Sequence, residues 1–569
     1  MTLDDESLTD PSTRSRRRPW VFLLAGVAAI AGALVAPASW PAGQGELRVF
    51  SEGQMAQAFA LEVGDTEPLT LDLDAPGVSG TIDLPNGAPL DAQLTLNISA
   101  LSVDPTELTI RLVLQDGREE LIPVVRTDRE TGTAEAARRP PVSTAPVLAL
   151  LGAVVVLWVT EAIPLWVTSL AVPVVIVATG VGGASQSLAN FFHPIIALFF
   201  AGFLMAEAMR RSKLDRLVAI SIIARAGRSP VTLFAAMLAM AAFLSLWMSN
   251  TAAAALLIPI ALAVTAPMQS LGYRKALVLS VAYASTLGGI GTVIGTPANP
   301  LAVAYLEDFV GRRVTFVDWL TIGLPFVLIF LPILGVYTWW RMGAAPDVER
   351  FSAARRVAQA ELAAAGRLTR DQLVVVAVFI GVIAVWLTEG WHGLETGIVA
   401  LAGAIALALL GRITQEDLGR ISWASLLTFG GGLTLGMFLL DSGASDWIAG
   451  QLAGLAVVPP SVAIAAIAAV TLGLTTVASN TAAAAMLIPL AIPLSAIIGV
   501  DPVLLVLVVA IASSIDFALV IGTPPTLLAY STRLFTPGHI FRVGIALDIA
   551  GLILIVTVMA WIWEILGVL

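Results

Sequence analysis

The chain has 569 residues, of which 57% are hydrophobic and only 13% are charged, and its mean hydropathy is +0.88. This composition excludes an ordinary water-soluble protein and is typical of a protein that crosses a membrane many times. The complete lack of cysteine excludes disulfides, thiolate catalysis and iron–sulfur centres, and the three histidines have no metal-ligand spacing. The net charge of −10 decides little, because in a membrane protein the sign of each loop matters more than the sum.

The chain begins with a polar tail that is followed by one apolar segment. Residues 1–18 end in a run of arginines and are predicted to remain in the cytoplasm, whereas residues 19–38 predict a first transmembrane helix. Ala36, Pro37 and Ala38 resemble a small-residue cleavage site, so a cleaved signal peptide is the alternative interpretation of this segment.

The next segment, residues 45–130, changes to a period of two, as at Leu108, Ile110, Leu112 and Leu114. Runs of this kind, separated by Gly, Pro, Asn and Asp, predict strands and therefore a small all-β domain inserted after the first helix. If that helix crosses outward, the β-domain is extracytoplasmic. Nothing in its residues predicts what it binds.

The remaining chain is an α-helical polytopic membrane body that consists of two repeats. Residues 144–340 and 371–569 are the predicted repeats, and residues 341–370 are a polar, basic linker predicted to be cytoplasmic. Three short motifs occur in both repeats in the same order, and their two copies are separated by nearly the same number of residues. The pairs are Glu161 and Glu389 (389 − 161 = 228), Thr251 and Thr481 (481 − 251 = 230), and Gly295 and Gly522 (522 − 295 = 227).

Each repeat contains two interruptions of its apolar pattern. Ser-Asn-Thr before four alanines is typical of a place where a membrane helix begins, and it predicts re-entrant hairpins near 232–265 and 458–495. Gly-Thr-Pro follows about 45 residues later and predicts a broken helix, because proline removes a backbone donor. Most basic loops fit a scheme in which the two hairpins enter from opposite sides, whereas Arg312 and Arg313 oppose it. The sequence thus predicts about ten spans, arranged in two inverted repeats with the C-terminus outside.

The residues around these interruptions suit a hard cation, because neutral hydroxyl, amide and carbonyl oxygens can serve as sodium ligands. A pair such as Ser245 and Ser249 shares one helix face if its half-helix is regular. The candidate sodium ligands are Ser245, Ser249, Asn250 and the backbone at Gly295 in the first half, and Thr475, Ala478, Asn480 and the backbone at Gly522 in the second.

An anion requires donors, and the candidate donors are Asn250, Thr251, Asn480 and Thr481. Neither motif contains a lysine or an arginine, so bound sodium is the predicted counter-charge. The affinities for anion and sodium should then depend strongly on each other.

The stretch SVAYASTLGGIGTVIGTPAN, residues 280–299, together with the paired Ser-Asn-Thr motifs, resembles the divalent anion/sodium symporters of the solute carrier 13 type. The resemblance covers about residues 144–569. It implies a homodimer in the cell membrane, in which each protomer has about eleven spans. It also implies an elevator mechanism in which a transport domain moves the site across the bilayer. It also implies sodium-coupled uptake of di- and tricarboxylates, or of sulfate. The substrate residues that it implies are Ser249, Asn250, Thr251, Thr296, Pro297, Ser479, Asn480, Thr481, Thr523 and Pro524.

Two positions depart from the family pattern. Thr526 stands where the family usually has asparagine, and Asp516 places a carboxylate at membrane depth, where an unpaired charge costs several kcal/mol. Asp516 is a candidate coupling group, either as a charged sodium ligand or as a protonatable group. Its alternative role is to cap a helix or bind the backbone.

The predicted function is sodium-driven import of a small carboxylate such as succinate, malate or fumarate. The predicted partners are sodium ions, membrane lipid and a second copy of the chain, and no nucleic acid is expected to bind. A sodium-independent dicarboxylate exchanger and a sulfate or citrate transporter of the same fold are alternatives. A receptor that uses the β-domain is a more remote one. An enzyme is not expected, because no nucleophile, base and orienting group converge in the motifs.

Overall fold

The structure is a computed structural model that describes residues 144–226, 229–344 and 368–569, a few positions between 356 and 363, and the backbone of eight strands between residues 45 and 137. The predicted tail (1–18), the predicted first helix (19–38) and most of the predicted linker lie outside the described residues. The chain divides into two units, one made chiefly of residues 149–569 and the other of residues 31–148 with 441–443.

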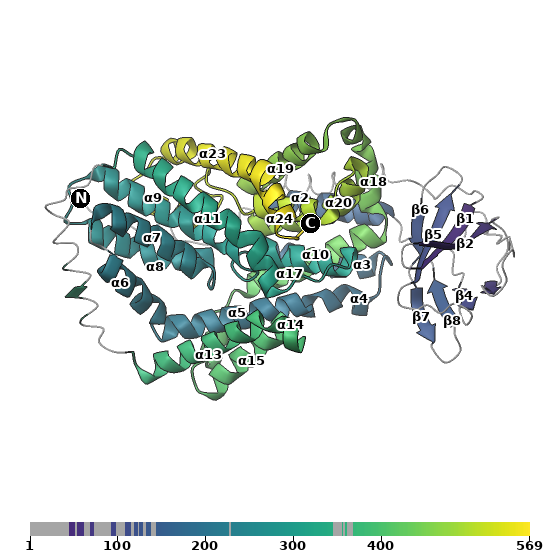
Figure 1. Cartoon of the computed structure of the whole chain (residues 1–569), viewed down its shortest axis with the longest axis horizontal. Helices are drawn as coiled ribbons and strands as arrows, with labels where there is room; N and C mark the ends of the chain where they lie inside the picture. The colour runs from purple at the N-terminus through teal and green to yellow at the C-terminus, as the bar shows by residue number, and fades with distance from the viewer. Residues whose placement is uncertain are drawn as a thin grey trace. The chain divides into compact units, whose positions relative to one another are not determined.

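The strands of the smaller unit form two four-stranded sheets (Figure 1), with the orders β2-β1-β5-β6 and β3-β4-β8-β7. Paired strands are antiparallel except β3 and β4, which run parallel. The strands are β1 Gly45–Ser51, β2 Gln54–Leu61, β3 Leu69–Asp72, β4 Gln93–Asn97, β5 Leu108–Leu114, β6 Glu119–Ile122, β7 Val124–Asp128 and β8 Thr133–Ala137. The side chains of this segment lie outside the described part, so an extracytoplasmic β-domain stays a prediction.

The larger unit is helical. Its first half contains α2 Thr144–Thr160, α3 Leu165–Ala178, α4 Ala184–Ala189, η3 Asn190–Phe192, α5 Pro194–Arg211, α6 Leu214–Ala226, α7 Pro230–Ser245, α8 Asn250–Thr265, α9 Leu271–Gly288, η4 Gly289–Gly291, α10 Ala298–Val310 and α11 Phe316–Arg341. Its second half contains α13 Arg370–Leu387, α14 Glu389–His392, α15 Thr396–Leu409, α16 Gln415–Leu418, α17 Trp423–Asp441, α18 Ala444–Gln451, η5 Ala453–Val457, α19 Pro460–Val477, α20 Asn480–Ile498, α21 Pro502–Ala512, α22 Pro524–Ser531, α23 Pro537–Leu554, the π-helical turn η6 Ile555–Met559 and α24 Ala560–Ile565.

Two helical hairpins, α7–α8 and α19–α20, carry the Ser-Asn-Thr motifs at their turns. Ser249 caps α8 by accepting a hydrogen bond from the amide of Ala252 at 3.3 Å, and Ser479 caps α20 through Ala482 at 3.2 Å. The prediction that each motif begins a helix is therefore confirmed. The helices α8 and α20 begin 480 − 250 = 230 residues apart. The offset between the two repeats that the sequence predicts therefore also relates the first residues of these helices.

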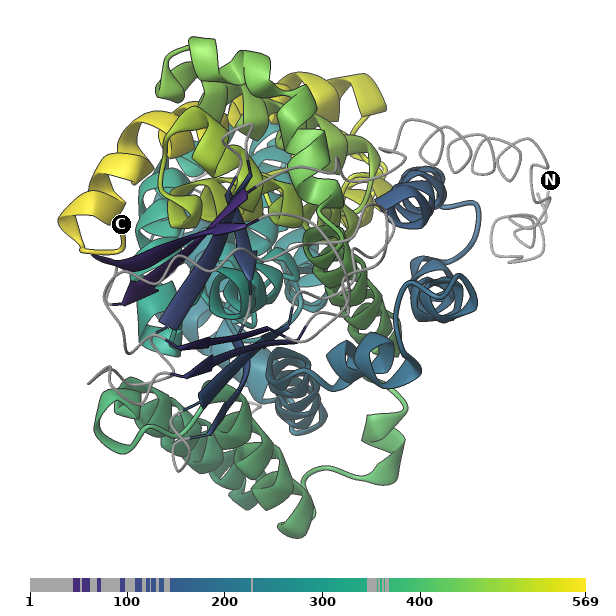
Figure 2. The ribbon, with the colours of Figure 1, turned by 90° about the vertical axis from the view of Figure 1, so that its right-hand side faces the viewer.

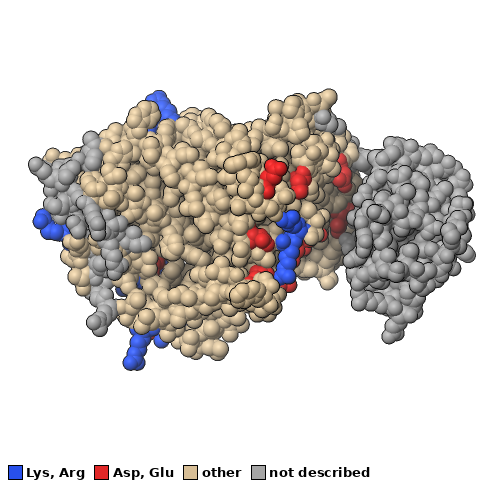
Figure 3. All heavy atoms as spheres, in the orientation of Figure 1, with Lys and Arg blue, Asp and Glu red and all other residues tan. Residues whose placement is uncertain are grey.

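Seven helical segments among the described residues are long and apolar enough to cross a membrane, and six shorter apolar helices accompany them. The seven are Ala184–Arg211, Phe316–Arg341, Arg370–Leu387, Trp423–Asp441, Pro460–Val477, Asn480–Ile498 and Pro537–Ile565. On the face shown in Figure 3, a band almost free of charged side chains separates basic side chains at one end from mostly acidic ones toward the other. A multi-pass membrane protein is thus shown, whereas eleven spans and their inverted sense stay predictions.

The two halves pack into each other. The helix α10 of the first half contacts α20 and α21, and α22 of the second half contacts α8 and α9. Two helices of the second half, α13 and α15, pack instead on α5, and both views place them along one edge of the unit (Figures 1 and 2). Small residues permit close approach within the core, since a Cβ atom at Gly288 of α9 would overlap the backbone of Ala242 in α7.

Candidate functional site

The turn of the first hairpin holds a compact group of three oxygens. Ser245 Oγ, at the end of α7, lies 2.7 Å from Asn250 Oδ1 and 2.5 Å from the backbone oxygen of Ser285 in α9. The hydroxyl has a single hydrogen, which can satisfy only one of the two acceptors at a time. Ser245 is completely buried, so bulk water does not reach its side chain. Closely spaced hydroxyl, amide and carbonyl oxygens of this kind suit a hard cation.

The second hairpin holds the same group of oxygens. Thr475 Oγ1, in α19, lies 2.8 Å from Asn480 Oδ1 and 2.7 Å from the backbone oxygen of Ser513. The offsets between the two groups are 475 − 245 = 230, 480 − 250 = 230 and 513 − 285 = 228. The repeat is therefore reproduced at the level of individual hydrogen bonds. We call these groups the first and the second oxygen cluster.

One detail of the sequence-based prediction is wrong. Ser245 ends α7 and Ser249 caps α8, so the two serines belong to different helices and share no helix face. Thr475 and Ser479 are separated in the same way, by the end of α19. The physical reason is the reversal of the chain at each hairpin turn, where the first helix ends before the serine of the motif.

Broken helices follow both hairpins, as proline predicts. In the first half α9 ends at Gly288 and α10 begins at Ala298, and in the second α21 ends at Ala512 and α22 begins at Pro524. The segments between them, which we call the first and second unwound segments, carry the predicted ligands Gly295, Thr296 and Pro297 and their counterparts Gly522, Thr523 and Pro524.

A single buried amide holds the first unwound segment. Asn299 Nδ2 lies 3.0, 3.3 and 2.6 Å from the backbone oxygens of Gly289, Ile290 and Thr292. The hydroxyl of Thr292 then donates to the backbone oxygen of Leu246 in the hairpin turn at 2.6 Å. This chain of hydrogen bonds fixes the segment against the hairpin. Thr296 Oγ1 is buried and has no hydrogen-bond partner among the described residues, so it is available to a ligand.

The second unwound segment is held differently. Thr526 replaces the amide of Asn299, and its hydroxyl lies only 2.9 Å from that of Thr523. The segment is fixed from outside instead, because the amide of Phe517 donates to Asp548 Oδ1 at 2.9 Å and the backbone oxygen of Phe517 accepts from Tyr283 Oη at 2.8 Å. Asp548 lies in α23 and Tyr283 in α9, so one bond joins the two halves of the chain.

The predicted anion donors lie nearer the surface than the oxygen clusters. Thr251 is exposed, and Asn250, Ser479, Asn480 and Thr481 are partly exposed. The predicted cation ligands Ser245, Thr475 and Ala478 are buried behind them. The site therefore has a buried layer of oxygens and an accessible layer of hydroxyl and amide groups, without a lysine or arginine in either motif.

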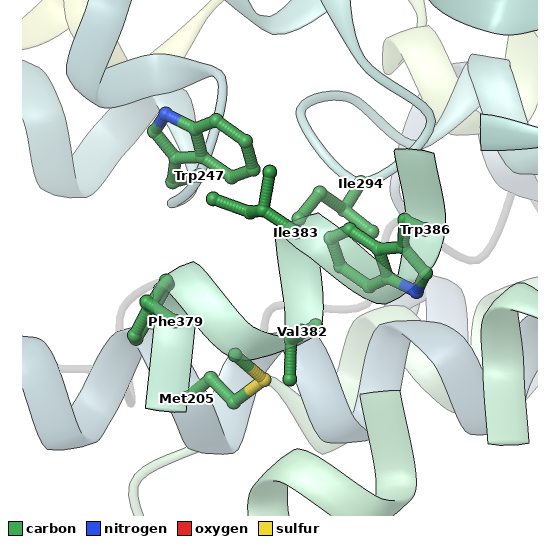
Figure 4. A pocket seen from close by; sticks show the side chains of 8 residues that line it. Met205, Trp247, Ile294, Phe379, Val382, Ile383 and Trp386 are labelled. Carbon is green, nitrogen blue, oxygen red and sulfur yellow. The ribbon is translucent and has the colours of Figure 1, made fainter. Parts of the chain in front are cut away.

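An apolar pocket adjoins the first hairpin turn (Figure 4). Trp247 of the turn and Ile294 of the first unwound segment face α13 and α5 across it. Its other lining residues are Gly202, Met205, Phe379, Val382, Ile383 and Trp386. Because the lining is almost entirely apolar, this pocket does not bind a carboxylate, but it marks where the hairpin meets the α5, α13 and α15 group.

Other residues singled out in the sequence lie apart from the site. Glu389 accepts from Arg313 at 3.0 Å and from Thr396 at 2.9 Å, and Arg312 donates to the backbone oxygen of Val568 at 3.0 Å. The two arginines that oppose the orientation scheme therefore have structural partners. His193, one of the three histidines of the chain, caps α5 by accepting from the amide of Ile195.

Several residues around the site were not singled out in the sequence. Ser285 and Ser513 contribute only backbone oxygens, which carry no sequence signal. Asp548, in contrast, is an aspartate within an apolar span, and this is the same signal that identified Asp516.

The chain is similar to one protein family and to several known transporters. The family described as "Sodium:sulfate symporter transmembrane region" matches residues 140–569. The chain is 31% identical over 430 residues to a protein of Staphylococcus saprophyticus named sodium-dependent dicarboxylate transporter SdcS, covering 70% of this chain and 82% of that one. It is 32% identical over 432 residues to an uncharacterized transporter of Haemophilus influenzae, covering 73% and 91%. Among solved structures, the YdaH transporter of Alcanivorax borkumensis matches with a TM-score of 0.46 at 16% identity, covering 67% of this chain and 88% of that one.

Proposed function

The chain belongs to the family described as the sodium:sulfate symporter transmembrane region, and on this basis we propose that it is a sodium-coupled importer of small di- or tricarboxylates. Relatives named sodium-dependent dicarboxylate transporters support both the cation and the class of substrate. Succinate, malate and fumarate are the proposed substrates.

The observation that carries this proposal is the pair of oxygen clusters. In each cluster one hydroxyl hydrogen faces two acceptor oxygens, Asn250 Oδ1 and Ser285 O in the first and Asn480 Oδ1 and Ser513 O in the second. A sodium ion bound at a cluster would be coordinated by these neutral oxygens. It also supplies positive charge that the motifs lack and so favours binding of an anion beside it.

Coupling follows from the same geometry. Asn250 and Asn480 belong to the cation clusters through their oxygens, and their amide groups are suited to donate to an anion. Binding of either partner therefore orders the side chain for the other, and the two affinities rise together. Each net positive charge moved inward gains about 2.3 kcal/mol per 100 mV of membrane potential, which can drive accumulation.

Uptake of radiolabelled succinate into proteoliposomes tests the function. An inward sodium gradient should drive accumulation, whereas an equal gradient of choline should not. If uptake does not depend on sodium but requires succinate inside the vesicles, the protein is a dicarboxylate exchanger and this proposal is wrong. Competition by unlabelled citrate and sulfate distinguishes the remaining substrates.

Elevator-type movement is part of the proposal, with both hairpins moving as a transport domain against a scaffold that includes α5, α13 and α15. The apolar lining of the pocket supports it, since the side chains that face each other across it can slide without leaving hydrogen bonds unmade (Figure 4). A homodimer built through the scaffold, with the N-terminus cytoplasmic and the C-terminus and β-domain outside, completes the proposed arrangement.

Cross-linking across this pocket should stop transport. The chain contains no cysteine, so Ile294→Cys combined with Val382→Cys introduces a unique pair. A short bifunctional thiol reagent should then inhibit uptake, and reductive cleavage of the linker should restore it. The control pair, Met205→Cys with Phe379→Cys, joins two scaffold helices and should leave uptake unchanged after the same treatment. Full activity of the cross-linked first pair would contradict relative movement here.

A further inference from the structure

Asp516 is a buried carboxylate for which the described residues supply no partner. Its side chain has no exposed surface, and neither carboxylate oxygen has a hydrogen-bond partner in the part of the chain that the structure describes. Residues 502–532, which surround it in the sequence, contain no lysine or arginine. A charge in this environment is strongly unfavourable unless a cation or a donor compensates it.

The position of Asp516 in the repeat identifies what it faces. Asp516 precedes Gly522 by 522 − 516 = 6 residues, and Gly289 precedes Gly295 by 295 − 289 = 6. A Cβ atom at Gly289 would overlap Asn250 Oδ1 of the first oxygen cluster, and one at Gly522 would overlap the carboxylate of Asp516. Asp516 therefore occupies, in the second unwound segment, the position that Gly289 occupies in the first. Gly289 lies beside the first oxygen cluster but has no side chain.

The neighbouring aspartate, Asp548, differs because one of its carboxylate oxygens is paired, whereas its Oδ2 is buried and has no hydrogen-bond partner among the described residues. Asp548 Oδ1 accepts from the amide of Phe517 at 2.9 Å and so holds the unwound segment beside Asp516. It is a positioning residue. Within the described ranges Asp516 makes no such bond to the backbone, so those residues give no support to the capping role that the sequence alone left open for it.

We propose that Asp516 is a carboxylate ligand of the sodium ion bound at the second oxygen cluster, and that the two cation sites therefore differ in charge. This inference rests on the proposed sodium coupling. In the first half only neutral oxygens surround the cation, so its charge remains available to the substrate. In the second half the carboxylate neutralises the cation. Sodium at the second site consequently binds without substrate, whereas sodium at the first site binds strongly only together with the anion.

Thermal unfolding of the purified protein, measured with increasing sodium chloride in place of choline chloride and without substrate, tests this difference. Wild type should be stabilised by sodium. Asp516→Asn should unfold at a higher temperature than wild type in the absence of sodium, because it lacks the uncompensated charge. The sodium concentration for half of the stabilisation should rise about 10- to 100-fold, as expected for loss of one charged ligand.

Two control variants separate the possible outcomes. Asp548→Asn also neutralises a buried carboxylate, but it should lower the unfolding temperature equally with and without sodium. Asn250→Ala, which removes a ligand of the first cluster, should retain the stabilisation by sodium alone. If wild type and Asp516→Asn respond to sodium identically, the carboxylate ligand is disproved while sodium coupling stands. If wild type shows no response to sodium with or without succinate, the proposed function itself fails.

Discussion

Replacing Asn250 or Asn480 with alanine should each lower sodium-driven succinate uptake by at least about 100-fold, because either change removes an oxygen from a cation cluster and a donor from the anion site. Two charge-assisted interactions of about 1.5–3 kcal/mol each are lost together. Both variants should show this loss, since the two asparagines occupy equivalent positions in the repeat and each serves a cation cluster and the anion. Initial uptake rates at succinate concentrations below KM measure the effect.

The control for these variants is Asn190→Ala. Asn190 lies at the end of α4, and its amide makes only a long contact of 3.5 Å with the sulfur of Met437, away from both motifs. Its replacement should leave uptake within about twofold of wild type, as for a change outside functional contacts. Substantial sodium-driven uptake by either Asn250→Ala or Asn480→Ala would contradict a site built from both halves.

Replacing Asn299 with leucine should destabilise the membrane unit by about 2–4 kcal/mol, because its amide joins three backbone oxygens inside the protein. Ile290 O keeps the indole of Trp319 as a donor and Thr292 O keeps the amide of Gly295, so the loss falls mainly on Gly289 O. Leucine has the same number and branching of side-chain heavy atoms as asparagine and a larger volume, so the change removes hydrogen bonds without opening a cavity. Thermal unfolding in one detergent provides the measurement.

The repeat supplies a matched comparison for this variant. Thr526→Val changes the equivalent position in the second half and removes only the bond between two hydroxyl groups, so it should cost about 0.5–1.5 kcal/mol. The two unwound segments should therefore differ clearly in their sensitivity. Equal losses in both variants would show that the amide of Asn299 does not hold the first segment.

Much of this architecture could be predicted from the sequence, because it depends on local features that repeat. Ser-Asn-Thr before alanines identifies a helix start, and the structure places a capping serine at both motifs. Proline after glycine and threonine identifies the broken helices. An offset near 230 residues relates helix starts and hydrogen bonds alike.

The remaining features depend on contacts between distant segments. Backbone oxygens such as Ser285 O cannot be recognised from residue types, and the role of Asn299 depends on the path of the chain before it. The shared helix face expected for Ser245 and Ser249 failed for a similar reason, since a periodicity argument assumes that the helix continues. Asp516 can be singled out from the sequence as a carboxylate in an apolar span. Only the folded structure shows that its carboxylate lies against Gly522.

The hydrogen bond from Tyr283 to the backbone oxygen of Phe517 has a consequence for biogenesis. The two residues are 234 positions apart, and Trp563 likewise donates to the backbone oxygen of Ile322 across 241 positions. While the ribosome is still synthesising the second repeat, the hydroxyl of Tyr283 has no access to this acceptor. The first repeat therefore enters the membrane in an incomplete form and reaches its final packing only after the last helices have been inserted.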